Sequence, residues 1–154
     1  MSGTTPKVLM VCLGNICRSP MAEGVLKHKA EELGIDIIVD SSGTSGWHED
    51  EQPDARAQEE MRNQGLDISD QRSRTFVIED FDQFDHILVM DISNKTNVLQ
   101  LARNSEDAGK VSLMLDYGNE VKGMSVPDPY YNDGFNHVYE LLDFACDAFL
   151  KSLK

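Results

Sequence analysis

The feature that most constrains the fold is a short loop between an apolar run and a helical pattern near the start of the chain. Residues 8–11 (VLMV) are apolar throughout, and residues 21–33 carry apolar side chains at helical spacing. Residues 12–20 (CLGNICRSP) join them. Such a strand–loop–helix junction favours anions, because the first N–H groups of a helix lack partners and the helix dipole is positive there.

Four residues of this loop suit an anion site that contains a reactive sulfur. Cys12 ends the strand, where a side chain emerges from the sheet, and Arg18 offers a planar fork that matches two phosphate oxygens. Gly14 and Asn15 adopt positive φ at little cost, which lets the loop curl with its N–H groups inward. A helix N-terminus and a nearby arginine favour a cysteine thiolate. Attack by Cys12 on a bound phosphorus atom is therefore predicted.

Alternatives remain for the pair Cys12 and Arg18 and for Ser19. Cys12 and Arg18 have a spacing that also occurs by chance, and a cysteine at a strand end is often only a packing residue. The preceding strand, the Gly-Asn turn and the Ser-Pro helix start favour the catalytic interpretation. Ser19 suits the N-cap of the helix, with Pro20 at its first position. Alternatively, its hydroxyl bonds the thiolate and makes it a better leaving group.

Residues 11–20 resemble, nearly position for position, the signature of the low-molecular-weight protein tyrosine phosphatases. The resemblance spans essentially the whole chain and is strongest at residues 8–24, 40–56 and 127–131. It implies hydrolysis of a phosphotyrosine-bearing protein or a small aryl phosphate through a cysteinyl phosphate, with inorganic phosphate as product. The loop residues that would surround the phosphoryl group are Leu13, Gly14, Asn15, Ile16, Cys17 and Ser19.

Alternating elements predict an α/β fold. Strands are expected at residues 7–12, 35–40, 85–90 and 111–115, and helices at 21–33, 54–63, 79–84, 135–153 and in a segment that ends near residue 103. This order predicts a doubly wound, flavodoxin-like, four-stranded parallel sheet with helices on both faces. Ligands of such sheets bind beyond the carboxyl ends of the strands, where Cys12 falls.

Length and charge limit the remaining possibilities. The 154 residues fit one domain, residues 1–154, expected as a monomer or weak dimer. A net charge of −13 disfavours nucleic acid and acidic membrane surfaces as partners. No run is long enough to span a membrane, and no signal-peptide pattern occurs. Three cysteines, an odd number, indicate a reducing compartment, so a cytoplasmic location is expected.

Hydrolysis also needs an acid for the leaving oxygen. Asp128 is a candidate because Pro127 and Pro129 restrict the backbone on both sides. An aspartate before a proline is also a common turn starter, and the chain holds 27 acidic residues, so the residues alone leave this choice open. The resemblance identifies residues 128–131 (DPYY) as the acid loop of the family, which implies that Asp128 is the general acid and later the base.

Aromatic residues suggest how a substrate ring is held. Trp47, the only tryptophan, either pins its Gly-Ser loop or stacks on a substrate ring opposite Tyr130 or Tyr131. The family has aromatic residues at these positions, which favours stacking. The implied slot is deep enough for phosphotyrosine and too deep for phosphoserine, and Leu13 is expected to touch the same ring.

Supporting residues are implied mainly by the resemblance. Asn15 and Ser42 are expected to form a network that holds the loop, although a simple turn asparagine and serine fit the sequence equally well. The family often has a histidine near residue 71, where this chain has Gln71, so that support is absent or altered. Asp91 then lacks its usual partner, and Arg72 is a possible substitute.

The other cysteines suggest redox protection and packing. Cys17 is either a small filler or the partner of Cys12 in a reversible disulfide that prevents over-oxidation, and the family pairs these two positions. Cys146 lies on the apolar stripe of the last helix and is expected to be inert. No metal is expected because the four histidines are scattered. No cofactor is expected because the Walker and dinucleotide motifs are missing.

Two other functions deserve comparison. An arsenate reductase uses the same fold and type of loop but needs two further cysteines as a relay, and residues 70–95 contain none. A non-catalytic phosphate-binding or redox-sensing module would keep Arg18 but would have no use for Asp128. The complete DPYY segment therefore favours the phosphatase.

Overall fold

A parallel sheet forms the centre of the molecule. The structure, a computed structural model, describes residues 5–46, 48–117, 122–129 and 134–153. The strands are β1 (Lys7–Cys12), β2 (Ile38–Gly43), β3 (His86–Val89) and β4 (Val111–Leu113), in the order β2-β1-β3-β4, and all neighbours are parallel. The doubly wound, flavodoxin-like sheet predicted from the sequence is confirmed.

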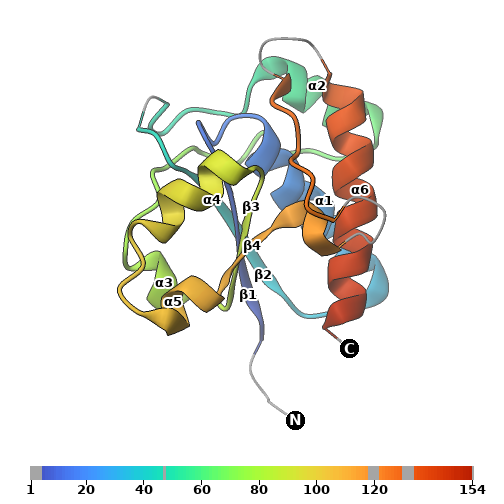
Figure 1. Cartoon of the computed structure of the whole chain (residues 1–154). Coiled ribbons are helices and arrows are strands. Elements are labelled where there is room, and N and C mark those ends of the chain that lie inside the picture. Colours follow the sequence, from blue (N-terminus) through green and yellow to red (C-terminus); the bar gives the residue numbers. More distant parts are fainter. Residues whose placement is uncertain (1–4, 47, 118–121, 130–133, 154) are drawn as a thin grey trace.

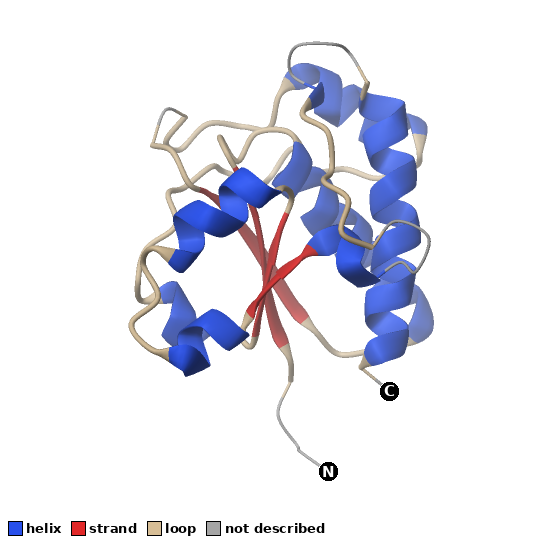
Figure 2. Ribbon diagram, viewed as in Figure 1, coloured by secondary structure: helices blue, strands red, loops and turns tan. Residues whose placement is uncertain are grey.

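Helices cover both faces of this sheet (Figures 1 and 2). One face carries α1 (Arg18–Leu33), α2 (Ala55–Asn63) and α6 (Phe135–Ser152), and the other carries α3 (Asp80–Gln83), α4 (Ile92–Leu99) and α5 (Ser105–Gly109). A 3-10 turn, η1 (Met114–Tyr117), follows β4. Within the described ranges, no helix has the length and apolar character needed to cross a membrane.

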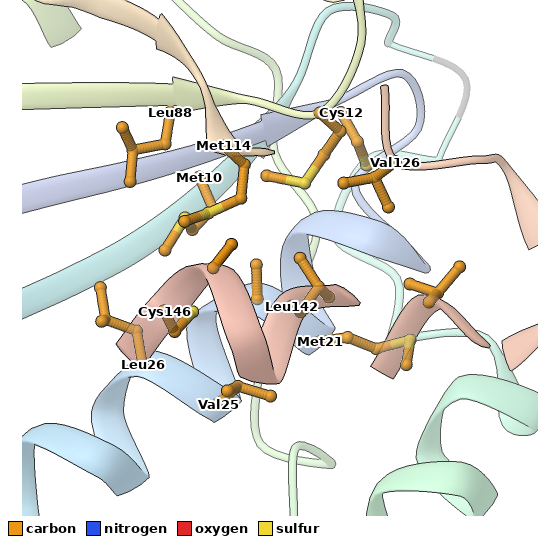
Figure 3. Packing of buried hydrophobic residues seen from close by; sticks show 14 of the residues in the cluster. Met10, Cys12, Met21, Val25, Leu26, Leu88, Met114, Val126, Leu142 and Cys146 are labelled. Carbon is orange, nitrogen blue, oxygen red and sulfur yellow. The ribbon is translucent and has the colours of Figure 1, made fainter. Parts of the chain in front are cut away.

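The continuous apolar run of β1 is explained by burial on both faces. Residues 8–11 are fully buried. Val8 and Met10 belong to the core cluster beneath α1 and α6, whereas Leu9 and Val11 belong to the cluster on the α3–α5 side, because successive strand side chains point to opposite faces. Figure 3 shows the first cluster, in which Met10 and other strand side chains face those of the helices.

Several boundaries differ from the predictions. Strand β2 begins at Ile38 and continues to Gly43, because its register pairs Lys7 with Ile38 and Cys12 with Gly43. The residues after Asp40 are polar, so the sequence read as a loop there. Helix α5 was not predicted, and it begins at a local cap in which the side chain of Asn104 accepts the N–H of Asp107.

Candidate active site

The loop after β1 brings a cysteine to the carboxyl end of a central strand. Cys12 is the last residue of β1 and is 3% exposed. Asn15 has a φ of 58°, the left-handed conformation expected for this turn. The backbone N–H of Asn15 thereby donates to Cys12 Sγ at 3.3 Å. The sulfur thus lies beneath the loop and accepts a backbone hydrogen bond, as an ionised thiolate prefers.

Ser19 contacts the sulfur and does not cap the helix. Helix α1 begins at Arg18, and its N-cap residue is Cys17, whose side chain makes no capping hydrogen bond. The hydroxyl of Ser19 lies 3.0 Å from Cys12 Sγ. The N-cap interpretation was therefore wrong, and Pro20 stands third in the helix instead of first. The alternative, a bond between the hydroxyl and the sulfur, is confirmed.

Asn15 connects this hydroxyl to the neighbouring strand. Its amide nitrogen Nδ2 donates to Ser19 Oγ at 2.8 Å and to Ser41 Oγ at 3.0 Å, while its oxygen accepts the N–H of Arg74 at 3.0 Å. The predicted partner Ser42 does not fill this place. Its own hydroxyl has no partner among the described residues, and only its carbonyl contributes, 3.4 Å from Ser19 Oγ. The error is one residue in a strand, which reverses the face of a side chain.

A close approach of two chain segments fixes the loop against β2. A Cβ atom at Gly43 would lie 2.7 Å from the carbonyl oxygen of Leu13 and 3.0 Å from the backbone N of Asn15. Only glycine leaves room for this contact. Gly14 is similarly covered, because a Cβ there would lie 3.1 Å from Cδ2 of His48. His48 Nδ1 in turn lies 3.2 Å from Oε2 of Glu51, a contact that no sequence motif indicates.

Arg18 is held in place by groups from distant parts of the chain. Its guanidinium nitrogen Nη1 donates to Asp91 Oδ2 at 2.6 Å and to the carbonyl of Val126 at 3.0 Å. Burial lowers the pKa of Arg18, but Cys12, Asp91 and Asp128 outweigh that effect, so its pKa lies above the ordinary value. Arg18 therefore stays charged although it is only 2% exposed.

Asp91 both caps a helix and holds the arginine of the loop. It caps α4 by accepting the N–H of Asn94 at 2.7 Å, and its other oxygen holds Arg18. The substitute partner proposed for Asp91 was wrong, because Arg72 donates to nearby backbone carbonyls. Gln71, at the position considered for the family histidine, donates to a carbonyl of helix α1 at 3.1 Å. The loop is supported through Asn15 instead.

The predicted acid lies on the same side as the arginine. Asp128 Oδ2 is 3.7 Å from Nη2 of Arg18, and the carboxylate is 31% exposed. Its side chain therefore faces the loop from a separate segment, with access to solvent. The predicted aromatic residues Trp47, Tyr130 and Tyr131 lie outside the described residues.

All three cysteines are free and buried. Burial, aided by Asp54 and Cys12, raises the pKa of Cys17 far above the ordinary value, so Cys17 is a neutral thiol at rest. Burial has the same effect on Cys146, which lies in the core as predicted. In the described part of the chain, no group of histidine, cysteine and carboxylate side chains is arranged to hold a metal.

The fold and this loop define a class: a doubly wound α/β protein with a tight turn above a cysteine at the carboxyl end of a central strand and a buried arginine beside it. The family model described as "Low molecular weight phosphotyrosine protein phosphatase" matches residues 7–154. The chain belongs to this family, whose members are hydrolases.

Relatives agree over almost the whole chain. A putative low molecular weight protein-tyrosine-phosphatase of Synechocystis is 42% identical over 151 residues, which is 96% of each chain. The Schizosaccharomyces pombe low molecular weight phosphotyrosine protein phosphatase is 40% identical over 153 residues, again 96% of each.

Solved structures agree equally well. The structure of YfkJ from Bacillus subtilis has a TM-score of 0.93 at 36% identity, covering 99% of this chain and 97% of that one. A protein tyrosine phosphatase from Entamoeba histolytica has a TM-score of 0.91 at 37% identity, covering 97% of each. A Drosophila protein named an arginine phosphatase has a TM-score of 0.88 at 35% identity, covering 96% and 98%.

Proposed function

We propose that the protein hydrolyses phosphotyrosine and small aryl phosphates through a phosphoryl group carried on Cys12. The observation that carries this proposal is the sulfur itself, which lies against the hydroxyl of Ser19 and the N–H of Asn15 at the base of a turn. The buried charge of Arg18 belongs to the same turn. Such preorganised donors act where negative charge gathers in phosphoryl transfer.

In the first step, the thiolate of Cys12 attacks phosphorus in line with the aryl oxygen. The S–P bond forms as the P–O bond to the ring breaks, and Asp128, in its acid form, gives its proton to the departing phenoxide. Arg18 and the loop N–H groups hold the equatorial oxygens. The products of this step are the phenol, the cysteinyl phosphate and the carboxylate of Asp128.

In the second step, that carboxylate takes a proton from water, and the resulting hydroxide attacks phosphorus. The S–P bond breaks, inorganic phosphate leaves, and the sulfur departs as a thiolate. The contacts from Ser19 and Asn15 then stabilise its charge. Asp128 is an acid again, and the cycle is complete.

The substrate proposal concerns the aryl ring. We infer a slot formed by Leu13, Trp47, Tyr130 and Tyr131, deep enough for phosphotyrosine. The substrate class is therefore a phosphotyrosine-bearing protein. The function is proposed to reside in one domain, residues 1–154, that acts in the cytoplasm as a monomer or weak dimer without cofactor.

An assay on four substrates tests this proposal. We expect hydrolysis of p-nitrophenyl phosphate and of a phosphotyrosine peptide, and at least about tenfold lower kcat/KM on the matched phosphoserine peptide. Phosphoarginine is included because one similar structure is named an arginine phosphatase. Preference for phosphoarginine would contradict the substrate class, and hydrolysis of none of the four would contradict the function.

An arsenate reductase is less well supported. Besides the nucleophile, such an enzyme needs two cysteines that pass oxidation outward. Cys146 is fully buried in the core between α6 and the sheet, which leaves only Cys17 for that task.

A reversible disulfide between Cys12 and Cys17 is part of the proposal. Peroxide would convert the thiolate of Cys12 to a sulfenic acid, and the thiol of Cys17 would condense with it, releasing water and forming the S–S bond. At rest the two thiols are free, and the raised pKa of Cys17 keeps it protonated.

Mild peroxide is therefore expected to give a reducible loss of activity in the unmodified protein. In Cys17→Ser, Cys12 is expected to reach sulfinic acid several times faster, as measured by peptide mass mapping. Cys146→Ser is the matched control and should behave like the unmodified protein. Equal rates of sulfinic acid formation with and without Cys17 would rule out the disulfide.

A further inference from the structure

A chain of buried hydrogen bonds leads from the sulfur of Cys12 to a carboxylate on helix α1. Ser19 Oγ lies 3.0 Å from Cys12 Sγ, and Asn15 Nδ2 lies 2.8 Å from Ser19 Oγ and 3.0 Å from Ser41 Oγ. Ser41 Oγ then donates to Oε1 of Glu23 at 2.7 Å. All five residues are at most 4% exposed. Water therefore has little access to the bonds of this chain.

Counting donors and acceptors shows that these bonds can run in only one direction when Glu23 is ionised. The oxygen of Asn15 accepts the N–H of Arg74, so its nitrogen must face the two hydroxyls and donates to both. An ionised carboxylate has no hydrogen, so Ser41 gives it the only one that its hydroxyl has. Ser19 already accepts from Asn15, and its own hydrogen remains for the sulfur of Cys12. The other acceptor near Ser19 is the carbonyl oxygen of Ser42, which lies farther from Ser19 Oγ, at 3.4 Å.

Glu23 differs from a solvated surface carboxylate. Its second oxygen lies 2.5 Å from Lys27 on the same helix. Glu23 lines a polar cavity of about 220 Å³. The same cavity is lined by Asp40 of β2 and by Asp70 and Arg72, which lie in the segment between α2 and α3. Burial raises the pKa of Glu23, and Asp40 adds to this, while Lys27 and the Ser41 bond act in the opposite direction. The cavity gives a proton a route to the carboxylate.

We propose that Glu23 is a positioning residue for the reaction: its carboxylate takes the hydrogen of Ser41, which leaves the oxygen of Ser41 free to accept from Asn15 and so anchors the amide that holds Ser19 against the sulfur of Cys12. When Glu23 is protonated, it can donate to Ser41 instead, and the hydrogen of Ser41 then competes with Asn15 for the space around the Ser41 oxygen, so the amide is anchored less firmly. Ser19 is then held less firmly as a donor to the sulfur, and the thiolate is less stabilised both before attack and when the cysteinyl phosphate breaks down. This inference rests on the proposed function.

Glu23→Met tests it, because methionine has a similar length but accepts no such hydrogen bond. Two rates are measured: iodoacetamide alkylation of Cys12, followed by mass mapping, and kcat with p-nitrophenyl phosphate. Both are expected to fall about tenfold at pH 7.5, the usual scale of one charge-assisted hydrogen bond, with KM within about twofold. Glu31→Met, the same change at an exposed position of α1, is the matched control and should leave both rates unchanged.

A double-mutant cycle separates this chain from a general loss of structure. Ser41→Ala breaks the chain one step nearer the sulfur and should lower the alkylation rate and kcat as much as Glu23→Met does. The double variant Glu23→Met/Ser41→Ala should be no slower than Ser41→Ala alone. If the fold-losses of the two single variants multiply in the double variant, the proposal is contradicted. An unchanged alkylation rate in Glu23→Met would contradict it as well. If Glu23→Met does not fold, alkylation of Ser41→Ala at the rate of the unmodified protein is the contradicting result.

The pH at which the alkylation rate of Cys12 falls on the acid side distinguishes this role of Glu23 from a merely structural one. Because ionised Glu23 is lost as pH falls, its contribution disappears on the acid side. Lys27→Met removes the cation that favours ionisation of Glu23, so the fall of the alkylation rate should move to higher pH. A fall at the same pH as in the unmodified protein would contradict the proposal. Alkylation does not require turnover, so a protein without phosphatase activity would overturn the proposed function while this test of Glu23 still stands.

Discussion

Replacing Cys12 with serine is expected to lower the hydrolysis of p-nitrophenyl phosphate by about 10⁴-fold or more, the scale on which the loss of a nucleophile acts. A serine hydroxyl is not ionised near neutral pH, and neither of the groups described as bonded to the sulfur, the hydroxyl of Ser19 and the N–H of Asn15, is a base that could take its proton. Initial rates measure the change.

Binding of inorganic phosphate should survive the same substitution. Arg18 keeps its bonds to Asp91 and to the carbonyl of Val126, so the anion site remains. Calorimetric titration with phosphate checks this. Cys146→Ser is the control, since it changes a buried cysteine of the core and leaves the loop intact. Turnover of Cys12→Ser within about tenfold of the unmodified protein would show that Cys12 is not the nucleophile.

Replacing Asp128 with asparagine is expected to slow the hydrolysis of phenyl phosphate by about 10²–10³-fold, the usual range for a general acid. Asparagine keeps the shape of the side chain but cannot give a proton to the phenoxide or take one from water. The position of the carboxylate, 3.7 Å from the guanidinium of Arg18, supports this role. Steady-state rates on both aryl phosphates measure the effect.

The dependence on the leaving group sharpens this prediction. Because p-nitrophenoxide leaves without help, its release in the first step should be slowed much less than that of phenoxide, and an initial burst of p-nitrophenol should appear. Asp36→Asn is the matched control, because this exposed aspartate lies between α1 and β2, at the opposite end of the sheet. Equal losses of the first-step rate on the two substrates, measured within the first turnover, would contradict a proton transfer to the leaving oxygen.

The sequence predicted the architecture and the central loop because both depend on local patterns. The run of apolar residues at 8–11, the Gly-Asn turn and the helical pattern after Pro20 place Cys12 and Arg18 at one strand end, as found. A strand buried on both faces, followed by a turn that tolerates positive φ, has few other arrangements.

Contacts between distant segments were harder to predict. Asn15 bonds Ser41 and not Ser42, because the side-chain face of β2 depends on its register with β1, which a single sequence does not specify. Arg18 also bonds the backbone carbonyl of Val126. Because every residue type has such a carbonyl, the sequence does not indicate this contact. Nothing in the helical pattern of residues 21–33 marks Glu23, which the fold buries against Ser41.

The most direct test of the central claim is the capture of the intermediate. Asp128→Asn, mixed with radiolabelled phenyl phosphate or p-nitrophenyl phosphate and quenched within the first turnover, is digested and mapped by mass. One phosphoryl group is expected on the peptide that contains Cys12, and none in Cys12→Ser. Turnover by the unmodified protein, with a burst in the Asp128 variant but no phosphoryl group on Cys12, would contradict the claim.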